Sequence, residues 1–165
     1  MTLKTVLFFI PIINKEVLMK YITGDLLDVT EGIICHGCNL SGGFGSGVAG
    51  AIARMYPSVR ENYHANYRDK FLGDISGLEV IDGLYILNCY TQQGYGRDKN
   101  VQYASYDAVR DSMVKVIDMA NTLGIKQVHI PRIGAGLGGL NWEIVENVLR
   151  NLEIHYGMEF VVHSL

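Results

Sequence analysis

The chain has 165 residues, of which 48% are hydrophobic and 19% are charged, a composition typical of one ordinary globular domain. That length is sufficient to bury a complete hydrophobic core. The formal net charge of −3 argues against broad, sequence-independent nucleic-acid binding, which normally requires an excess of Lys and Arg.

Residues 1–18 are set apart from the rest. The stretch 6–13 is apolar, but it is too short to span a bilayer, and no small-residue cleavage site of a secretory signal follows it. The stretch 14–17 can be encoded by codons that contain a bacterial ribosome-binding sequence just upstream of the Met19 codon. We therefore expect Met19 to be the natural start and residues 1–18 to be a translated leader, with an added edge strand or a disordered arm as the alternatives.

From Met19 onward the pattern predicts strands and helices in alternation. Glycines and Pro57 mark the ends of several elements, and Asp82-Gly83 between two apolar runs favours a hairpin with a tight primed turn. The expected elements are strands at 20–23 and 33–37, helices at 48–56 and 58–70, a hairpin of 78–81 with 84–90, a helix at 103–123, a strand at 127–130, a helix at 143–156 and a strand at 159–163. This order predicts a three-layer α/β/α domain with a central mixed sheet, whose loops gather at the carboxyl ends of the strands.

The glycine-rich run 33–53 is the most informative stretch. An apolar strand leads into a glycine loop, and the helix that begins near Gly47 points free N–H groups and its positive dipole end at an anion. His36 and Asn39 would lie beside the bound group. The stretch 130–142 repeats this order and ends in a helix capped by Asn141. Two such loops predict a ligand of diphosphate size.

Two other motif matches are weaker. The glycines at 45, 47 and 50 fit the dinucleotide-binding pattern G-x-G-x-x-G, but the polar helix that follows replaces the strand and acidic residue that this fold needs. Cys35 and Cys38 form a C-x-x-C without a second pair, and strand alternation sends them to opposite faces. We expect these two thiols and Cys89 to be buried in a cytoplasmic protein, with no metal and no cofactor.

Each candidate residue also has a structural interpretation. A lone histidine on a strand is usually a core group, although its place beside a glycine loop gives His36 a possible role at a phosphate or ribose. Asp25 is either an ordinary turn carboxylate or an acceptor for an adenine amino group. The sequence leaves both choices open.

The loops taken together resemble a known family. G-D-L-L at 24–27, C-N-L-S-G-G-F-G-S-G-V-A at 38–49 and P-R-I-G-A-G-L-G-G-L-N-W at 131–142 are similar to the macrodomain superfamily, the ADP-ribose-binding α/β/α modules. The resemblance runs from about Met19 to Leu165, so we expect 19–165 to be one macrodomain. The stretch 36–39 and the Thr91-Gln92 pair that leads into a Tyr-Gly loop look most like the ADP-ribose 1''-phosphate phosphatases.

That resemblance implies a site. Asp25 would hold the adenine amino group beside the main-chain N–H of Leu26, Asn39 would bind the distal ribose, and Tyr95 would cover the distal end. His36 is the expected catalytic residue, acting either by attack on phosphorus or by protonation of the leaving oxygen. The diphosphate and the distal ribose would lie between two loops, one formed by Gly45, Ser46, Gly47 and Val48, the other by Ile133, Gly134, Ala135, Gly136 and Leu137.

The resemblance therefore predicts a phosphatase that acts on ADP-ribose 1''-phosphate, with ADP-ribose or this phosphate as its small-molecule ligand and no membrane partner. A monomer is expected. One alternative is a non-catalytic ADP-ribose-binding module. The other is an ADP-ribosyl hydrolase acting on modified protein or nucleic acid, but the related lysine-dependent branch carries a lysine where this chain has Gln92.

Overall fold

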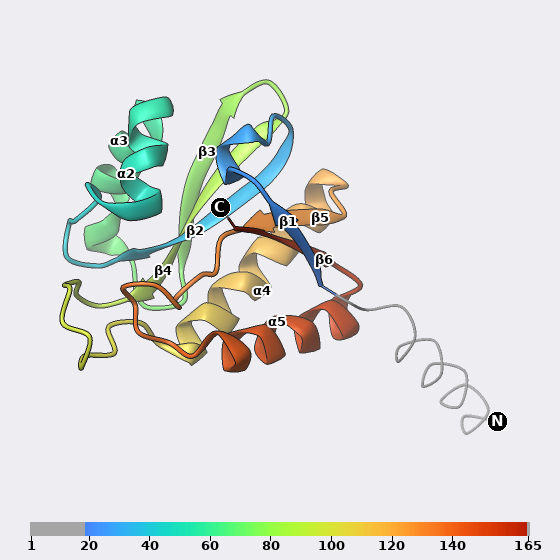
Figure 1. Cartoon of the computed structure of the whole chain (residues 1–165). Helices are drawn as coiled ribbons and strands as arrows, with labels where there is room; N and C mark the ends of the chain where they lie inside the picture. The colour runs from blue at the N-terminus through green and yellow to red at the C-terminus, as the bar shows by residue number, and fades with distance from the viewer. Residues whose placement is uncertain (1–18, 165) are drawn as a thin grey trace.

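Six strands and the helices that connect them make up the part of the chain that the computed structural model describes, residues 19–164 (Figure 1). The leader expected at residues 1–18 lies outside this part. No helix within it is both long and apolar enough to cross a membrane. The elements are β1 (Lys20–Thr23), η1 (Leu26–Asp28), β2 (Gly32–Asn39), α2 (Gly47–Met55), α3 (Pro57–Asn66), η2 (Tyr67–Asp69), β3 (Ile75–Ile81), β4 (Leu84–Gln92), α4 (Tyr106–Leu123), β5 (Gln127–Ile130), α5 (Trp142–Tyr156) and β6 (Glu159–Ser164).

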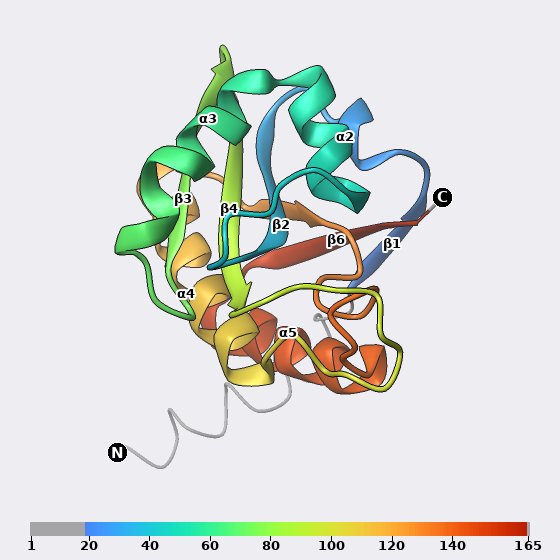
Figure 2. The same ribbon diagram turned by 90° about the vertical axis from the view of Figure 1, so that its left-hand side faces the viewer.

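The strands form one mixed sheet in the order β1-β6-β5-β2-β4-β3. Every neighbouring pair is parallel except β3 with β4. Helices α2 and α3 cover one face, and α4 and α5 cover the other (Figure 2). The three-layer α/β/α arrangement is therefore confirmed, and the parallel strands deliver their carboxyl ends to a common edge.

Each face of the sheet has its own hydrophobic core. Cys35 and Cys89 belong to the core beneath α4 and α5, whereas Cys38 belongs to the core beneath α2 and α3. Successive side chains of a strand point to opposite faces, so the predicted separation of Cys35 from Cys38 is confirmed. All three thiols are free and buried, and they act as small apolar groups.

The predicted hairpin of β3 and β4 is present, but its turn is not of the primed type. Only Gly83 has a positive φ, of 81°, and Asp82 does not. Primed turns need a positive φ at the first central residue, so that part of the prediction is wrong. The register shifts between Glu79 and Ile81, and such a bulge supplies the twist that a primed turn would provide.

Three predicted boundaries also need correction. β2 extends to Asn39 rather than to Gly37, so His36 lies farther from the end of its strand than predicted. The helix predicted over 58–70 is α3 followed by η2, and it is not merely a surface helix because Val59 and Tyr63 are fully buried. Helix α4 begins three residues later than predicted because Ser105 caps it.

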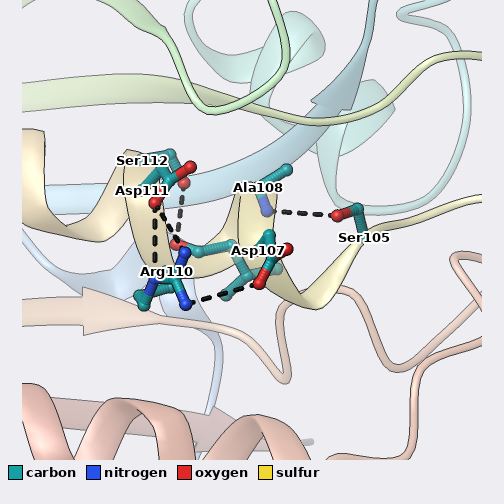
Figure 3. Close-up of polar contacts among 7 residues, drawn as sticks. Ser105, Asp107, Ala108, Arg110, Asp111 and Ser112 are labelled. Atoms are coloured by element: carbon teal, nitrogen blue, oxygen red, sulfur yellow. Dashed lines mark hydrogen bonds and ion pairs between the residues drawn. The ribbon is translucent and has the colours of Figure 1, made fainter.

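The amino-terminal end of α4 is fixed by local polar contacts (Figure 3). The Ser105 hydroxyl accepts a hydrogen bond from the Ala108 N–H at 3.2 Å, which satisfies one of the free donors of the first turn. The Ser105 N–H donates to the Thr91 carbonyl at 2.9 Å. The Arg110 guanidinium pairs with Asp107 and Asp111 on the exposed side. These contacts anchor the end of the loop 93–104 that leaves β4.

Glu153 gives the fold a pH dependence that can be measured. Its side chain is 1% exposed, and one carboxyl oxygen accepts from the Phe160 N–H at 2.7 Å. Burial raises its pKa to about 7. The folded protein therefore keeps a proton on Glu153 that the unfolded chain releases near pH 4.5. The contribution of this proton to the stability of the fold is complete below pH 4.5 and is lost as the pH rises through 7.

We expect the free energy of unfolding of the wild type, relative to Glu153→Gln, to fall by up to about 3 kcal/mol between pH 4.5 and pH 8. Gln does not titrate, so the comparison removes contributions from other groups. Urea denaturation of both proteins across this range measures the difference. A difference that stays constant with pH contradicts the prediction.

Candidate functional site

A cleft of about 560 Å³ lies where the carboxyl ends of the parallel strands meet. This volume is within the usual range for small-molecule sites. Two other hollows, of about 650 and 710 Å³, lie around Lys126 and around Phe71, and neither is lined by the predicted glycine loops. The cleft is lined by His36, Gly37, Cys38, Ser46, Gly47, Val48, Ala49, Gln92, Tyr95, Gly96, Arg97, Pro131, Arg132, Ile133, Gly134, Gly136, Leu137 and Gly138.

Asn39 and Tyr63 shape the first glycine loop. The Asn39 Oδ1 accepts from the N–H groups of Ser41 and Gly43, at 3.0 and 3.1 Å, and its Nδ2 donates to the Gly43 carbonyl at 2.8 Å. The Tyr63 hydroxyl contacts Asn39 at 2.8 Å and accepts from the Gly42 N–H at 3.0 Å. The Asn39 amide is thus occupied within the protein and is not among the groups that line the cleft.

The amino-terminal end of α2 opens into the cleft without a side-chain cap. Ser46 is the N-cap residue, yet its hydroxyl makes no capping hydrogen bond, in contrast to Ser105 on α4 and Asn141 on α5. Gly50 lets the loop lie against the helix, because a Cβ there would be 2.8 Å from the Gly45 carbonyl oxygen. Uncapped N–H groups at a positive dipole end form a site for an anion.

Two further loops form the opposite wall. Gly134 in the second glycine loop has a φ of 77°, and the Leu140 N–H closes this loop by donating to the Gly134 carbonyl at 2.9 Å. The Gly138 carbonyl accepts from the N–H groups of Tyr103 and Ala104, both at 2.9 Å. These bonds tie the loop after β4 to the loop after β5. Residues of both loops line the cleft together with the first glycine loop.

His36 lies in the floor of the cleft. Its side chain is 1% exposed, its Nε2 lies 2.7 Å from the Asn88 Oδ1, and the Phe44 ring packs edge-on against it at 5.4 Å. Burial lowers the pKa of His36 to about 4. The ring is therefore neutral at pH 7, when it can accept a proton or act as a nucleophile but cannot serve as a proton donor in place of an imidazolium.

Many of the predicted site residues line the cleft, and others lie outside it. Those that line the cleft are His36, Ser46, Gly47, Val48, Tyr95, Ile133, Gly134, Gly136 and Leu137. Those that do not line it are Asp25, Leu26, Asn39, Gly45 and Ala135. The Tyr95 ring lies against Gly43, where an added Cβ would be 2.7 Å from it, so it bridges two of the loops.

Asp25 and Leu26 follow β1 at the edge of the sheet. Asp25 is exposed, and its Oδ1 accepts from the Leu27 N–H at 2.9 Å, which caps η1. The Leu26 side chain is buried in the core beneath α2 and α3. The second carboxylate oxygen of Asp25 makes no hydrogen bond within residues 19–164 and can accept one from a ligand.

The sequence analysis missed the charged groups of the cleft. Arg97 and Arg132 line it, and no Asp or Glu among residues 19–164 does so. Within the described part of the chain neither arginine makes an ion pair, although the Arg132 guanidinium lies 5.7 Å from the centre of the Trp142 ring. Arg132 stands within the second glycine loop, and this position is the one signal that could have identified it. The cleft is therefore cationic in a protein with a net charge of −3.

Comparison with known proteins agrees with this geometry. The family model described as Macro domain matches residues 35–149. The chain belongs to the Macro domain family. An uncharacterized 17.5 kDa protein of Enterobacteria phage T4 is 33% identical over 144 residues, covering 80% of this chain and 88% of the phage protein.

Similar proteins with named activities include two kinds of hydrolase. An ADP-ribose 1''-phosphate phosphatase of Meyerozyma guilliermondii is 28% identical, with 82% of this macrodomain and 94% of the yeast protein covered. A DNA ADP-ribosyl glycohydrolase of Thermus aquaticus is 25% identical, with 89% of this chain but 41% of the other covered. The chain thus resembles hydrolases of ADP-ribose derivatives, and the phosphatase matches it over nearly its full length.

Solved structures share the fold. A Bacteroides thetaiotaomicron protein of unknown function has a TM-score of 0.83 and 30% identity, covering 92% of this macrodomain and 100% of its own chain. Thermosipho africanus DarTG in complex with ADP-ribose has a TM-score of 0.72 and 16% identity, covering 90% of this chain and 42% of that one. The second likeness concerns the fold alone.

The missing cap on α2 predicts different effects of two serine substitutions. Ser105→Ala removes a capping hydrogen bond and should lower the free energy of unfolding by about 1 kcal/mol. Ser46→Ala removes no such bond and should change it by less than about 0.5 kcal/mol. Chemical denaturation of both variants measures the difference, and equal losses would indicate that Ser46 caps α2 in solution.

Proposed function

We propose that this macrodomain hydrolyses the terminal phosphate of ADP-ribose 1''-phosphate, which yields ADP-ribose and inorganic phosphate. The observation that carries the proposal is the cationic cleft into which the uncapped end of α2 opens. Such a site suits a ligand with several phosphate oxygens. The near full-length likeness to a yeast ADP-ribose 1''-phosphate phosphatase supports the same substrate. The three free thiols agree with a cytoplasmic setting.

In this proposal the loops bind the substrate along the edge of the sheet. The main-chain N–H groups near Gly47 and the loop 133–137 hold the diphosphate and the distal ribose. Asp25 accepts a hydrogen bond from the adenine amino group, with Leu26 beside it. Asn39 contributes by holding the first loop in shape. Backbone donors fixed before the substrate arrives stabilise charge without reorganisation, which is the effect that usually contributes most to such catalysis.

His36 is the proposed catalytic residue, and a neutral ring supports one of the two roles that the sequence left open. Protonation of the leaving oxygen needs an imidazolium, which is scarce at pH 7 when the pKa is about 4. Attack on phosphorus needs a free lone pair, which a neutral ring provides. We therefore assign nucleophilic attack to His36.

A second candidate function is ADP-ribose binding without turnover. It is favoured by the burial of the His36 ring, which also suits a purely structural histidine. An ADP-ribosyl hydrolase is the third possibility. It is supported by the glycohydrolase relative, but with Gln92 at the lysine position its chemistry would have to proceed through water.

The phosphatase proposal predicts that His36→Ala loses phosphate release from ADP-ribose 1''-phosphate while ADP-ribose affinity stays within about tenfold. The reason is that the loops bind the ligand and only His36 reacts. Phosphate release and calorimetric binding are measured for wild type, His36→Ala and the control His155→Ala, which alters an exposed histidine on α5.

Circular dichroism shows whether each variant folds, and His36→Gln is a second variant that keeps a polar group beside Asn88. Turnover in a folded His36→Ala protein would refute the catalytic role. A wild type that binds ADP-ribose but releases no phosphate would favour the binding module.

The adenine assignment predicts that Asp25→Ala lowers the affinity for ADP-ribose by about tenfold or more and leaves the affinity for ribose 5-phosphate almost unchanged. The reason is that one charge-assisted hydrogen bond contributes roughly 1.5–3 kcal/mol to binding. Asp28→Ala is the matched control, because it removes an exposed carboxylate from the same turn. Calorimetric titration with both ligands measures the effect. Equal losses for the two ligands would refute the assignment.

A further inference from the structure

The loop that leaves β4 is anchored on both sides of Arg97. Gly96 lies so close to the Tyr103 hydroxyl that a Cβ at this glycine would overlap it. The Asp98 N–H donates to the same hydroxyl at 3.3 Å. The Tyr103 N–H donates to the Gly138 carbonyl in the second glycine loop at 2.9 Å. The residues before and after Arg97 therefore contact one phenol, whose own backbone is tied to the wall of the cleft.

Arg97 brings a positive charge to the cleft that no carboxylate of the described chain neutralises. Its side chain is exposed and lines the cleft. Asp98 is its neighbour in sequence, but the Asp98 Oδ1 accepts from the Asn100 N–H at 2.9 Å. Within residues 19–164 Arg97 makes no ion pair. The guanidinium is therefore available to an anionic ligand, and its planar fork suits phosphate oxygens.

Tyr95 shows which part of the cleft Arg97 can reach. The Tyr95 ring crosses from the loop after β4 to Gly43 in the first glycine loop, and in the proposed binding mode it covers the distal end of the ligand. Only one residue separates Tyr95 from Arg97, so their Cα atoms are at most about 7 Å apart. An arginine side chain spans such a distance. Arg97 can therefore contact a group bound at the distal end.

Arg132 lies toward the other side of the sheet. Its guanidinium is 5.7 Å from the centre of the Trp142 ring, and the Trp142 Nε1 donates to the Tyr21 hydroxyl at 3.1 Å. Tyr21 belongs to β1, the strand that leads to Asp25. Since the proposed function places adenine at Asp25, Arg132 is the arginine nearer the adenine side. This leaves Arg97 as the cation for the distal end.

We propose that Arg97 binds the terminal phosphate and makes the cleft prefer ADP-ribose 1''-phosphate over ADP-ribose. The inference rests on the phosphatase function proposed above, whose substrate and product differ by this one phosphate. A phosphate monoester carries about two negative charges at pH 7, and a guanidinium can bind it through two N–H groups. ADP-ribose lacks the terminal phosphate, so its release removes the contact with Arg97. Arg97 therefore favours the substrate over the product in competition for the cleft.

The first test compares the two ligands by calorimetric binding, in a His36→Ala background so that the substrate is not consumed. Arg97→Gln should lower the affinity for ADP-ribose 1''-phosphate about tenfold to a hundredfold, as expected for loss of a charge-assisted hydrogen bond. It should leave the affinity for ADP-ribose within about threefold. Equal losses for the two ligands, or no loss for either, would overturn the assignment.

Two other cations provide the comparison. Lys99→Gln removes the same charge from an exposed position of the same loop that does not line the cleft, and it should leave the preference unchanged. Arg132→Gln should lower the affinity for both ligands by similar factors. An effect of Lys99→Gln as large as that of Arg97→Gln, or a loss of preference in Arg132→Gln alone, would contradict contact between Arg97 and the terminal phosphate.

The second test uses the protein with His36 intact and does not depend on the folding of His36→Ala. Arg97→Gln should raise the KM for ADP-ribose 1''-phosphate about tenfold or more and leave inhibition by ADP-ribose within about threefold. Turnover with an unchanged KM in Arg97→Gln would overturn the Arg97 assignment alone. A wild type that prefers the phosphorylated ligand through Arg97 but releases no phosphate would overturn the phosphatase function alone.

Discussion

The shape of the ligand cleft depends on the hydrogen bonds between Tyr63 and Asn39. The Tyr63 hydroxyl is a donor to Asn39 and an acceptor for the Gly42 N–H, so one phenol connects α3, the end of β2 and the glycine loop. Its ring stacks with those of Tyr67 and Tyr90, at 5.3 and 6.0 Å. Burial raises the pKa of Tyr63 well above its ordinary value, so the phenol keeps the proton that it donates.

This arrangement divides the polar groups of the loop between two tasks. The Asn39 amide and the Tyr63 hydroxyl satisfy the loop from within, and this leaves the loop with a fixed shape before any ligand binds. Ser46 leaves the first N–H groups of α2 without a side-chain partner. Those groups lie at an exposed helix end, where water satisfies them, so a ligand gains them without breaking a protein hydrogen bond.

Local patterns made most of the fold and much of the cleft predictable. Strand ends, glycine loops and helix caps are properties of neighbouring residues, and the elements they predicted are present within a few residues. The environment of His36 was not predictable, because Asn88 is 52 residues away in the chain and meets it through strand pairing. Asn39 was expected to lie beside the ligand because it stands where the glycine loop begins and because the family resemblance implies contact with the distal ribose. The sequence does not reveal that the Tyr63 hydroxyl hydrogen-bonds to the Asn39 amide and so holds that amide within the loop.

The charges of the cleft come from two guanidinium groups and the end of one helix. Arg97 and Arg132 line the cleft, and the dipole end of α2 is a property of its backbone. His36 adds no charge there, because burial holds its pKa at about 4. In the proposed function, attraction of the anion and reaction with it therefore belong to different groups. A cationic histidine in the same floor would attract phosphate more strongly but would lack the lone pair. In the proposed reaction, the burial of His36 therefore keeps the ring in the neutral form that attack on phosphorus requires.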